Sequence, residues 1–196
     1  MFKWFKKKQT ESSISNPSTV PENIPKEEEQ LCLKNLSDND EAKRISAIKT
    51  FAYYRSKSAV EPLIKLLRSL APNRKNADER LEIVVAMGKI GDSRFINPLI
   101  DCLDDMSEPL GSNEAYRVCT NASYSLGEIG DSRAIAPLSS ILHNTNIDYY
   151  RRSIAAKALA LIDDKNSLKA LKAVIHDSNE TVRKTALSLI KNMEKA

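Results

Sequence analysis

Two short glycine-flanked segments carry the residue types of an acid-base or phosphate-binding loop. One is Gly130-Asp131-Ser132-Arg133, inside "LGEIGDSRAIAPL", and the other is Gly91-Asp92-Ser93-Arg94, inside "MGKIGDSRFINPL", 39 residues earlier. In such a loop the aspartate could transfer a proton and the arginine could hold an anion. A catalytic loop has no reason to recur once per repeat, so the repetition favours a structural role.

In the structural interpretation, each segment is a turn that joins two helices. Gly91 and Gly130 fall where a helix ends and where a positive φ angle is least costly. Asp92 and Asp131 can accept hydrogen bonds from the amides that open the next helix, and can pair with an arginine of a neighbouring repeat. We therefore predict that these four residues are repeat turns and caps.

The remaining reactive residue types form no catalytic or metal-binding pattern. His143 and His176 are expected at equivalent helix ends, and the sequence has no His-Glu dipeptide, zinc-ligand spacing or Walker loop. Cys32, Cys102 and Cys119 contain no CxxC pair and are expected to be buried thiols of a reducing compartment. We therefore expect no catalytic residue, no metal and no cofactor.

Tyr149-Tyr150 followed by Arg151-Arg152 allows two interpretations. Aromatic rings beside arginines could stack on the bases and bind the phosphates of a nucleic acid. Alternatively, the segment opens a helix with one buried tyrosine and with one arginine in a position that recurs between repeats. The second interpretation is favoured, because the charge of the chain is balanced outside its first residues.

The composition indicates an all-helical protein without a strongly basic body. The 196 residues are 41% hydrophobic and 29% charged, and they include only five glycines, which favours helices. The formal net charge of +4 equals the charge of the four lysines at positions 3, 6, 7 and 8, which leaves 26 basic against 26 acidic residues. A nucleic-acid partner is therefore disfavoured, because phosphate binding requires a basic surface.

The chain is predicted to contain a tail and one repeat domain. Residues 1–23 form a basic, aromatic tip and a flexible tether, and the tether, residues 9–23, has too little apolar content to offset the entropy of ordering. Residues 24–196 contain paired segments with apolar residues at three- and four-residue steps, which predicts about ten helices. One position recurs in each first helix of a pair, and it is held by Arg44, Arg80, Cys119, Arg152 and Arg183.

The recurring turn, proline and arginine positions resemble those of a known family. "LGEIGDSRAIAPL", "MGKIGDSRFINPL" and "NETVRKTALSLI" are similar to the HEAT-like repeats associated with phycobilisome lyases. The resemblance spans about residues 25–196 and implies a right-handed alpha-alpha superhelix, a HEAT-like solenoid with the second helices on its concave face. Two turns depart from the pattern, because Arg55-Ser56-Lys57-Ser58 and Asp163-Asp164-Lys165-Asn166 lack its glycine.

Our first functional hypothesis is a non-catalytic scaffold or adaptor for protein–protein interaction. Another protein would bind on the concave face, or on the edge formed by the connections at residues 69–78 and 104–114. The candidate contact residues are the expected exposed positions of the second helices, Lys65, Arg68, Asp101, Lys169 and Lys172. The alternative, implied by the resemblance alone, is a subunit of a bilin lyase or a chaperone for a bilin and a phycobiliprotein.

The N-terminal sequence "MFKWFKKK" suggests a weak, reversible contact with an anionic membrane. Aromatic rings favour the membrane interface, and each lysine adds about 1 kcal/mol near an anionic leaflet. The candidate contact residues are Phe2, Lys3, Trp4, Phe5, Lys6, Lys7 and Lys8. No apolar run that could form a signal peptide or a membrane span follows them, so the expected location is cytoplasmic, with a peripheral contact at the inner face of a membrane.

Overall fold

The computed structural model describes residues 23–71, 74–103 and 113–195, and within these ranges it contains helices and no strand. The described ranges hold ten α-helices, as the periodicity predicted. They are α2 (Lys26–Asn35), α3 (Glu41–Tyr54), α4 (Val60–Ser69), α5 (Ala77–Ile90), α6 (Ile96–Asp101), α7 (Asn113–Ile129), α8 (Ile135–His143), α9 (Tyr149–Ile162), α10 (Lys165–Lys172) and α11 (Glu180–Met193).

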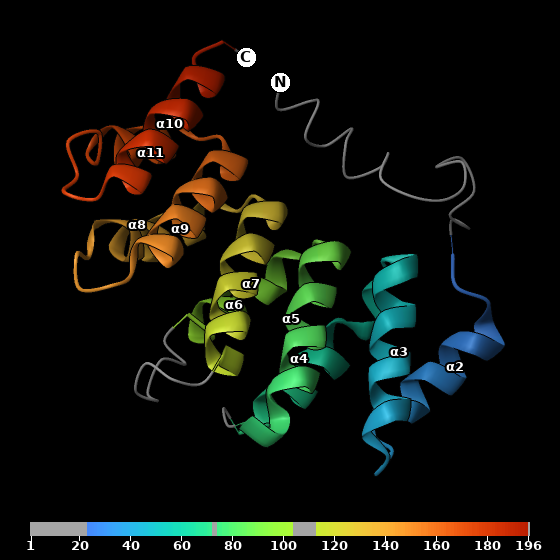
Figure 1. The fold of residues 1–196 in the computed structure, drawn as a ribbon. Helices are drawn as coiled ribbons and strands as arrows, with labels where there is room; N and C mark the ends of the chain where they lie inside the picture. The colour runs from blue at the N-terminus through green and yellow to red at the C-terminus, as the bar shows by residue number, and fades with distance from the viewer. Residues whose placement is uncertain (1–22, 72–73, 104–112, 196) are drawn as a thin grey trace, which may run out of the picture.

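The helices form two layers that run along the stack (Figure 1). The first layer contains α3, α5, α7, α9 and α11, and each of these helices packs on the next one. The second layer contains α4, α6, α8 and α10, which lie behind the first layer in Figure 1. Helix α2 packs against α3 at the N-terminal end of the stack. Each pair of helices buries its apolar faces against its neighbours, as in a repeat protein.

One hydrophobic core runs between the layers. Its largest fully buried side chains come from successive helices and turns, among them Phe51, Met87, Phe95, Leu126 and Leu159. These residues belong to the apolar positions at three- and four-residue spacing that predicted the helices. The core is therefore assembled repeat by repeat along the chain.

The turns between the layers require a left-handed backbone conformation. Gly91 and Gly130 end α5 and α7 with φ angles of 73° and 76°. Arg55 and Asp163 hold the equivalent positions after α3 and α9, and they adopt the same conformation with φ angles of 50° and 53°. A side chain makes this conformation costly, so the two turns without glycine are the strained members of the series.

The turn aspartates hold the backbone and the arginine of their own turn. Asp92 accepts from the amide of Arg94 at 3.0 Å and from its Nε at 2.9 Å, and Asp131 repeats both contacts with Arg133. Within the described residues, neither turn aspartate pairs with a first-helix arginine of a neighbouring repeat, whereas Asp78 of α5 does pair with Arg117 of α7. The link between repeats instead runs from Arg133 Nη2 to the carbonyl oxygen of Ser93, at 2.9 Å.

The side chains at the recurring first-helix position bond to carbonyl groups that end or follow the preceding helix. The last turn of a helix leaves its carbonyl groups without partners inside the helix, so the arginines that bond to Leu70, the C-cap of α4, and to Leu142, in the last turn of α8, act as caps. Asp38, Leu103 and Ser178 lie beyond the ends of their helices, and there the bond holds the connection between helices. In the third copy the thiol of Cys119 takes the place of a guanidinium. The bonds run from Arg44 to Asp38 O at 2.8 Å, Arg80 to Leu70 O at 2.7 Å, Cys119 to Leu103 O at 3.5 Å, Arg152 to Leu142 O at 2.9 Å, and Arg183 to Ser178 O at 2.9 Å.

Two further glycines set the distance between first-layer helices. A Cβ atom on Gly127 of α7 would lie 2.9 Å from the Cα atom of Ala158 in α9. A Cβ atom on Gly88 of α5 would lie 2.5 Å from Oγ of Ser125 in α7, and this hydroxyl donates to the carbonyl of Val84 at 2.9 Å. The absence of a side chain at both glycines therefore permits the close packing of α5, α7 and α9.

Candidate interaction surfaces

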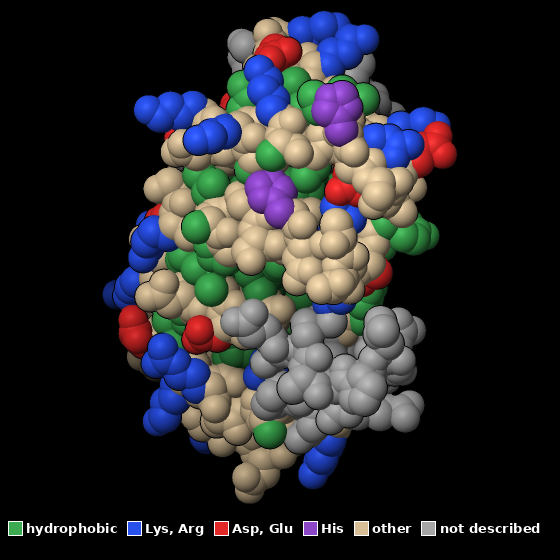
Figure 2. Space-filling view, turned by 90° about the vertical axis from the view of Figure 1, so that its left-hand side faces the viewer, with side chains coloured by type: hydrophobic (Ala, Val, Ile, Leu, Met, Phe, Trp, Pro, Cys, Tyr) green, Lys and Arg blue, Asp and Glu red, His purple; other side chains and the backbone are tan. Residues whose placement is uncertain are grey.

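The cysteines and His143 lie where the sequence suggested, whereas His176 lies in the turn after α10, beyond its last residue Lys172. Both histidines are exposed at the end of the stack that carries α8 and α10, and Figure 2 shows them in purple. His143 Nε2 lies 3.0 Å from the carbonyl oxygen of Ala170. Cys32, Cys102 and Cys119 are buried free thiols. Among the described residues, no three His, Cys, Asp or Glu side chains are grouped as metal ligands.

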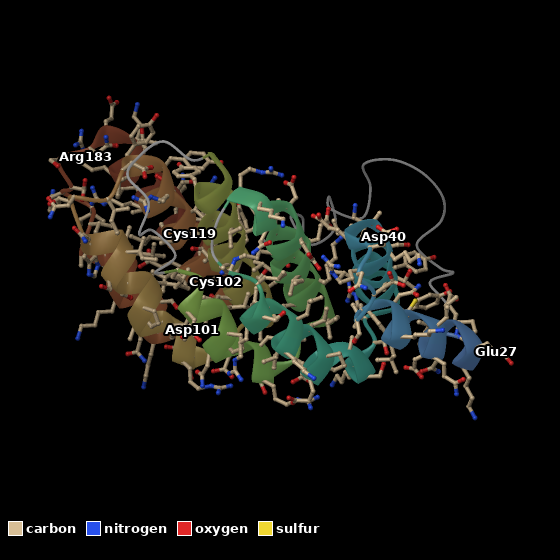
Figure 3. All side chains as sticks on the ribbon, turned by 90° about the horizontal axis from the view of Figure 1, so that it is seen from below. Glu27, Asp40, Asp101, Cys102, Cys119 and Arg183 are labelled. Carbon is tan, nitrogen blue, oxygen red and sulfur yellow. The ribbon has the colours of Figure 1, made fainter. Side chains whose placement is uncertain are left out.

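The five candidate contact residues of the second layer are all exposed to solvent. Lys65 and Arg68 lie on α4, Asp101 ends α6, and Lys169 and Lys172 lie on α10. Figure 3 labels Asp101 on the side of the stack where the second layer lies. The five residues are spread over three helices, an arrangement suited to a broad contact surface and unsuited to convergent chemistry.

Tyr116 of α7 and Tyr149 and Tyr150 of α9 lie at the junction of these helices, and we call them the tyrosine cluster; the two residues of α9 are exposed and Tyr116 is partly buried. The rings of Tyr116 and Tyr150 are stacked, with centroids 5.8 Å apart and an interplanar angle of 24°. Tyr149 and Tyr150 open α9 and are 51% and 50% exposed. The guanidinium carbon of Arg151 lies 5.8 Å from the centroid of the Tyr116 ring. The cluster thus presents aromatic rings on two adjoining helices of the first layer.

Asp148, the N-cap of α9, fixes the geometry of the tyrosine cluster. Its carboxylate accepts from the amides of Tyr150 and Arg151 at 3.0 Å each, and from Arg151 Nε at 2.5 Å. The hydroxyl of Tyr116 donates to the same carboxylate at 3.3 Å. Burial, together with the charge of Asp148, raises the pKa of Tyr116 to about 12. The phenol therefore stays protonated and remains a donor at neutral pH.

The structure corrects the expected burial of Tyr149-Tyr150. Both rings are half exposed, whereas one was expected to be buried. Arg152 does hold the recurring position, and Arg151 and Arg152 are buried and paired with Asp148 and Asp177. Their guanidinium groups are therefore committed inside the protein, which argues against phosphate binding by this segment.

Some predicted contact regions lie outside the described residues. They comprise residues 72–73 of the first long connection, residues 104–112 of the second, and the tip, with Phe2, Lys3, Trp4, Phe5, Lys6, Lys7 and Lys8. In the sequence, Tyr149 and Tyr150 are neighbours, whereas Tyr116 lies outside their motif. Tyr116 comes from the preceding repeat, so the spacing along the chain gave no direct signal for the stacked pair.

The repeated helix pairs, the side chain–carbonyl bonds at the recurring position and the exposed surfaces together define a helical repeat protein. Residues 29–118 match the family model of HEAT repeats, and residues 118–144 match the model of the PBS lyase HEAT-like repeat. The chain is therefore a HEAT-like repeat protein, as its recurring motifs indicated. A comparison with curated protein sequences finds no match.

A solved structure confirms the HEAT-type solenoid fold. The chain is similar to a structure of the complex of CpcE and CpcF of phycocyanin lyase from Nostoc sp. PCC7120, with a TM-score of 0.65 and 20% sequence identity. The match covers 93% of this chain and 71% of the other. Human deoxyhypusine hydroxylase in complex with glycerol matches at a TM-score of 0.41 and 16% identity over 84% of each chain, too low a similarity to carry an argument.

Proposed function

We propose that the protein is a non-catalytic scaffold that binds another protein in the cytoplasm. The tyrosine cluster carries this proposal, because half-exposed tyrosines on a folded surface are typical of binding hot spots. A tyrosine ring adds a large contact area and loses little side-chain entropy on binding. Asp148 and Arg151 already hold Tyr116, on which Tyr150 stacks, so a partner would not have to order this pair of rings.

Replacement of both exposed rings, Tyr149→Ala with Tyr150→Ala, is expected to weaken capture of a native partner. Loss of a hot spot costs about 2 kcal/mol or more, which corresponds to a roughly thirtyfold weaker affinity. The measurement is affinity capture from native extract, followed by titration of the captured protein.

Tyr53→Ala is the matched control, because Tyr53 is 56% exposed and lies on α3, away from the tyrosine cluster. The control variant should keep the partner. Equal affinities of the double variant and the unmodified protein would contradict the role of the cluster.

A second candidate function is a subunit of a bilin lyase or a chaperone for a bilin and a phycobiliprotein. The match of residues 118–144 to the PBS lyase HEAT-like repeat and the similarity to the phycocyanin lyase structure favour it. In this function the protein would hold a linear tetrapyrrole beside the acceptor protein. Absorbance spectra of the purified protein mixed with bilin test it, and an unchanged bilin spectrum would reject it.

The basic, aromatic tip is proposed to recruit the scaffold weakly to an anionic membrane. In the part of the chain that the structure describes, no helix is both long enough and apolar enough to span a membrane. The full chain is expected to float with anionic liposomes, and a chain that starts at Gln9 is expected to float less, because it lacks four lysines and three aromatic rings. Equal flotation would remove the tip from the proposal.

A further inference from the structure

The second layer carries a surplus of exposed basic side chains. Its helices α4, α6, α8 and α10 present five exposed basic residues and two exposed acidic residues. The basic residues are Lys65, Arg68, Lys165, Lys169 and Lys172, and the acidic residues are Glu61 and Asp101. Figure 2 shows Lys and Arg side chains along the left-hand edge of the stack, where the second layer lies.

Salt bridges within the protein neutralise little of this positive charge. Lys172 pairs with Glu194 at 2.7 Å, and Glu61 pairs with Arg94 at 3.4 Å. No salt bridge joins the other four basic residues of these helices to a carboxylate of the described ranges. In the first layer, by contrast, neighbouring helices are linked by the salt bridges Arg44–Glu79, Lys49–Glu82 and Arg117–Asp78.

The middle of the second layer is poor in charge. Between the basic helices α4 and α10, the exposed residues of α6 and α8 include Asn97, Ala136 and Ser140, and the one charged residue in the two helices is Asp101. An uncharged centre with a charged rim is the usual composition of a protein–protein interface. A nucleic acid would instead require a basic track without interruption, because its phosphates follow one another closely.

We infer that the exposed face of α4, α6, α8 and α10 is a contact surface for an acidic protein. The inference rests on the proposed scaffold function and adds to the tyrosine cluster of the first layer a contact surface on the second layer, with a stated chemistry of the partner. Carboxylates on the partner would meet Lys65 and Arg68 at one rim and Lys165 and Lys169 at the other. Exposed charge pairs of this kind speed association and weaken as salt is added.

Binding of poly-L-glutamate tests the inference. The full chain is titrated with the labelled polymer at about 50 mM and about 300 mM sodium chloride, and fluorescence anisotropy reports the affinity. The variant Lys65→Glu, Arg68→Glu and Lys169→Glu is expected to bind roughly tenfold or more weakly at the lower salt concentration. High salt should remove most of this difference, because it screens exposed charges.

The matched control changes the same net charge on the other layer. Lys89→Glu, Lys157→Glu and Lys191→Glu replace exposed lysines of α5, α9 and α11, and this variant should keep most of the affinity. Equal losses in the two variants would overturn the inference, because they would show a response to net charge alone. Tighter binding of single-stranded DNA than of poly-L-glutamate would overturn it in favour of a nucleic acid.

The inference and the proposed function can fail separately. Poly-L-glutamate binding depends on the second layer, whereas capture of the native partner by the tyrosine variants reports on the first layer. The variant Tyr149→Ala with Tyr150→Ala could still capture the native partner while the second-layer variant loses polymer binding. This result would exclude the tyrosine cluster as a contact surface and would still support the basic surface of the second layer.

Discussion

Replacement of Arg152 by methionine is expected to lower the free energy of unfolding by about 3–5 kcal/mol. The guanidinium forms a salt bridge with Asp177, and the two side chains are only 3% and 6% exposed. Arg152 Nε also donates to the carbonyl of Leu142 at 2.9 Å. The variant would leave a buried carboxylate without its counter-charge and the end of α8 without its cap. Urea unfolding followed by far-ultraviolet circular dichroism measures the loss.

Acid should reduce the difference between the unmodified protein and Arg152→Met. Burial alone would raise the pKa of Asp177, but the hydrogen bonds from Arg152 and from the amide of Asn179 outweigh it and hold the pKa below its usual range. A lowered pKa stabilises the folded state above the pKa of an unfolded aspartate, about 3.9, and this contribution is lost as the pH falls through the folded pKa. In Arg152→Met, burial without the counter-charge raises the pKa of Asp177, so this carboxyl takes up a proton at a higher pH than in the unmodified protein. The difference in stability between the two proteins should therefore begin to narrow above about pH 4 and narrow further as the pH falls through the lowered pKa of the unmodified protein.

Two control variants separate the buried pair from a general effect of lost arginine. Arg117→Met removes a salt bridge to Asp78 whose side chains are 50% and 73% exposed, so the expected cost is at most about 1 kcal/mol. Arg152→Met combined with Asp177→Asn should be more stable than Arg152→Met alone, because no buried charge is left unpaired. Similar losses for Arg152→Met and Arg117→Met would show that burial of the pair adds nothing.

The fold could be predicted because its signals are local and recur. Gly91 and Gly130 mark helix ends in which a positive φ angle is needed, and Asp92 and Asp131 follow them at the start of the next helix. The spacing of the apolar residues predicted the helices, and the recurrence of this unit along the chain predicted the stack of helix pairs. The turns at Arg55 and Asp163 show that the turn conformation persists without glycine, so the repeat and not the residue type identifies it.

The surfaces were harder to predict, because they depend on how repeats lie beside each other. The stacked pair of Tyr116 and Tyr150 joins two helices that adjoin in space but belong to successive repeats of the chain. The pattern within a single helix therefore does not predict their contact. Gly88 and Gly127 did leave a signal. They are 39 residues apart, the same spacing as the turn glycines, and this periodicity could have identified them as packing positions.

Replacement of Gly127 by alanine is expected to lower the free energy of unfolding by about 1–3 kcal/mol, although alanine is the better helix former. The added Cβ atom would lie 2.9 Å from Cα and 3.0 Å from the carbonyl oxygen of Ala158, and both are backbone atoms of α9. This clash can therefore be relieved only if α7 and α9 move apart, and that movement weakens the packing around them. Thermal unfolding measures the change.

Gly130→Ala and Gly88→Ala show whether the obstacle at Gly127 is the neighbouring backbone. At Gly130 a Cβ atom meets nothing within 4 Å, and the cost of about 1 kcal/mol comes from the positive φ angle alone. At Gly88 the nearest atoms are Oγ of Ser125 at 2.5 Å, Oε2 of Glu128 at 2.8 Å and Cβ of Ser125 at 2.8 Å, and the Glu128 oxygen is the far end of a flexible side chain that can move aside. Adding Ser125→Gly to Gly88→Ala should therefore recover stability. A substitution at Ala158 cannot rescue Gly127→Ala in the same way, because the obstructing atoms are the Cα and the carbonyl oxygen of that residue, and both remain. A double variant no more stable than Gly88→Ala would show that Ser125 does not set the distance between α5 and α7.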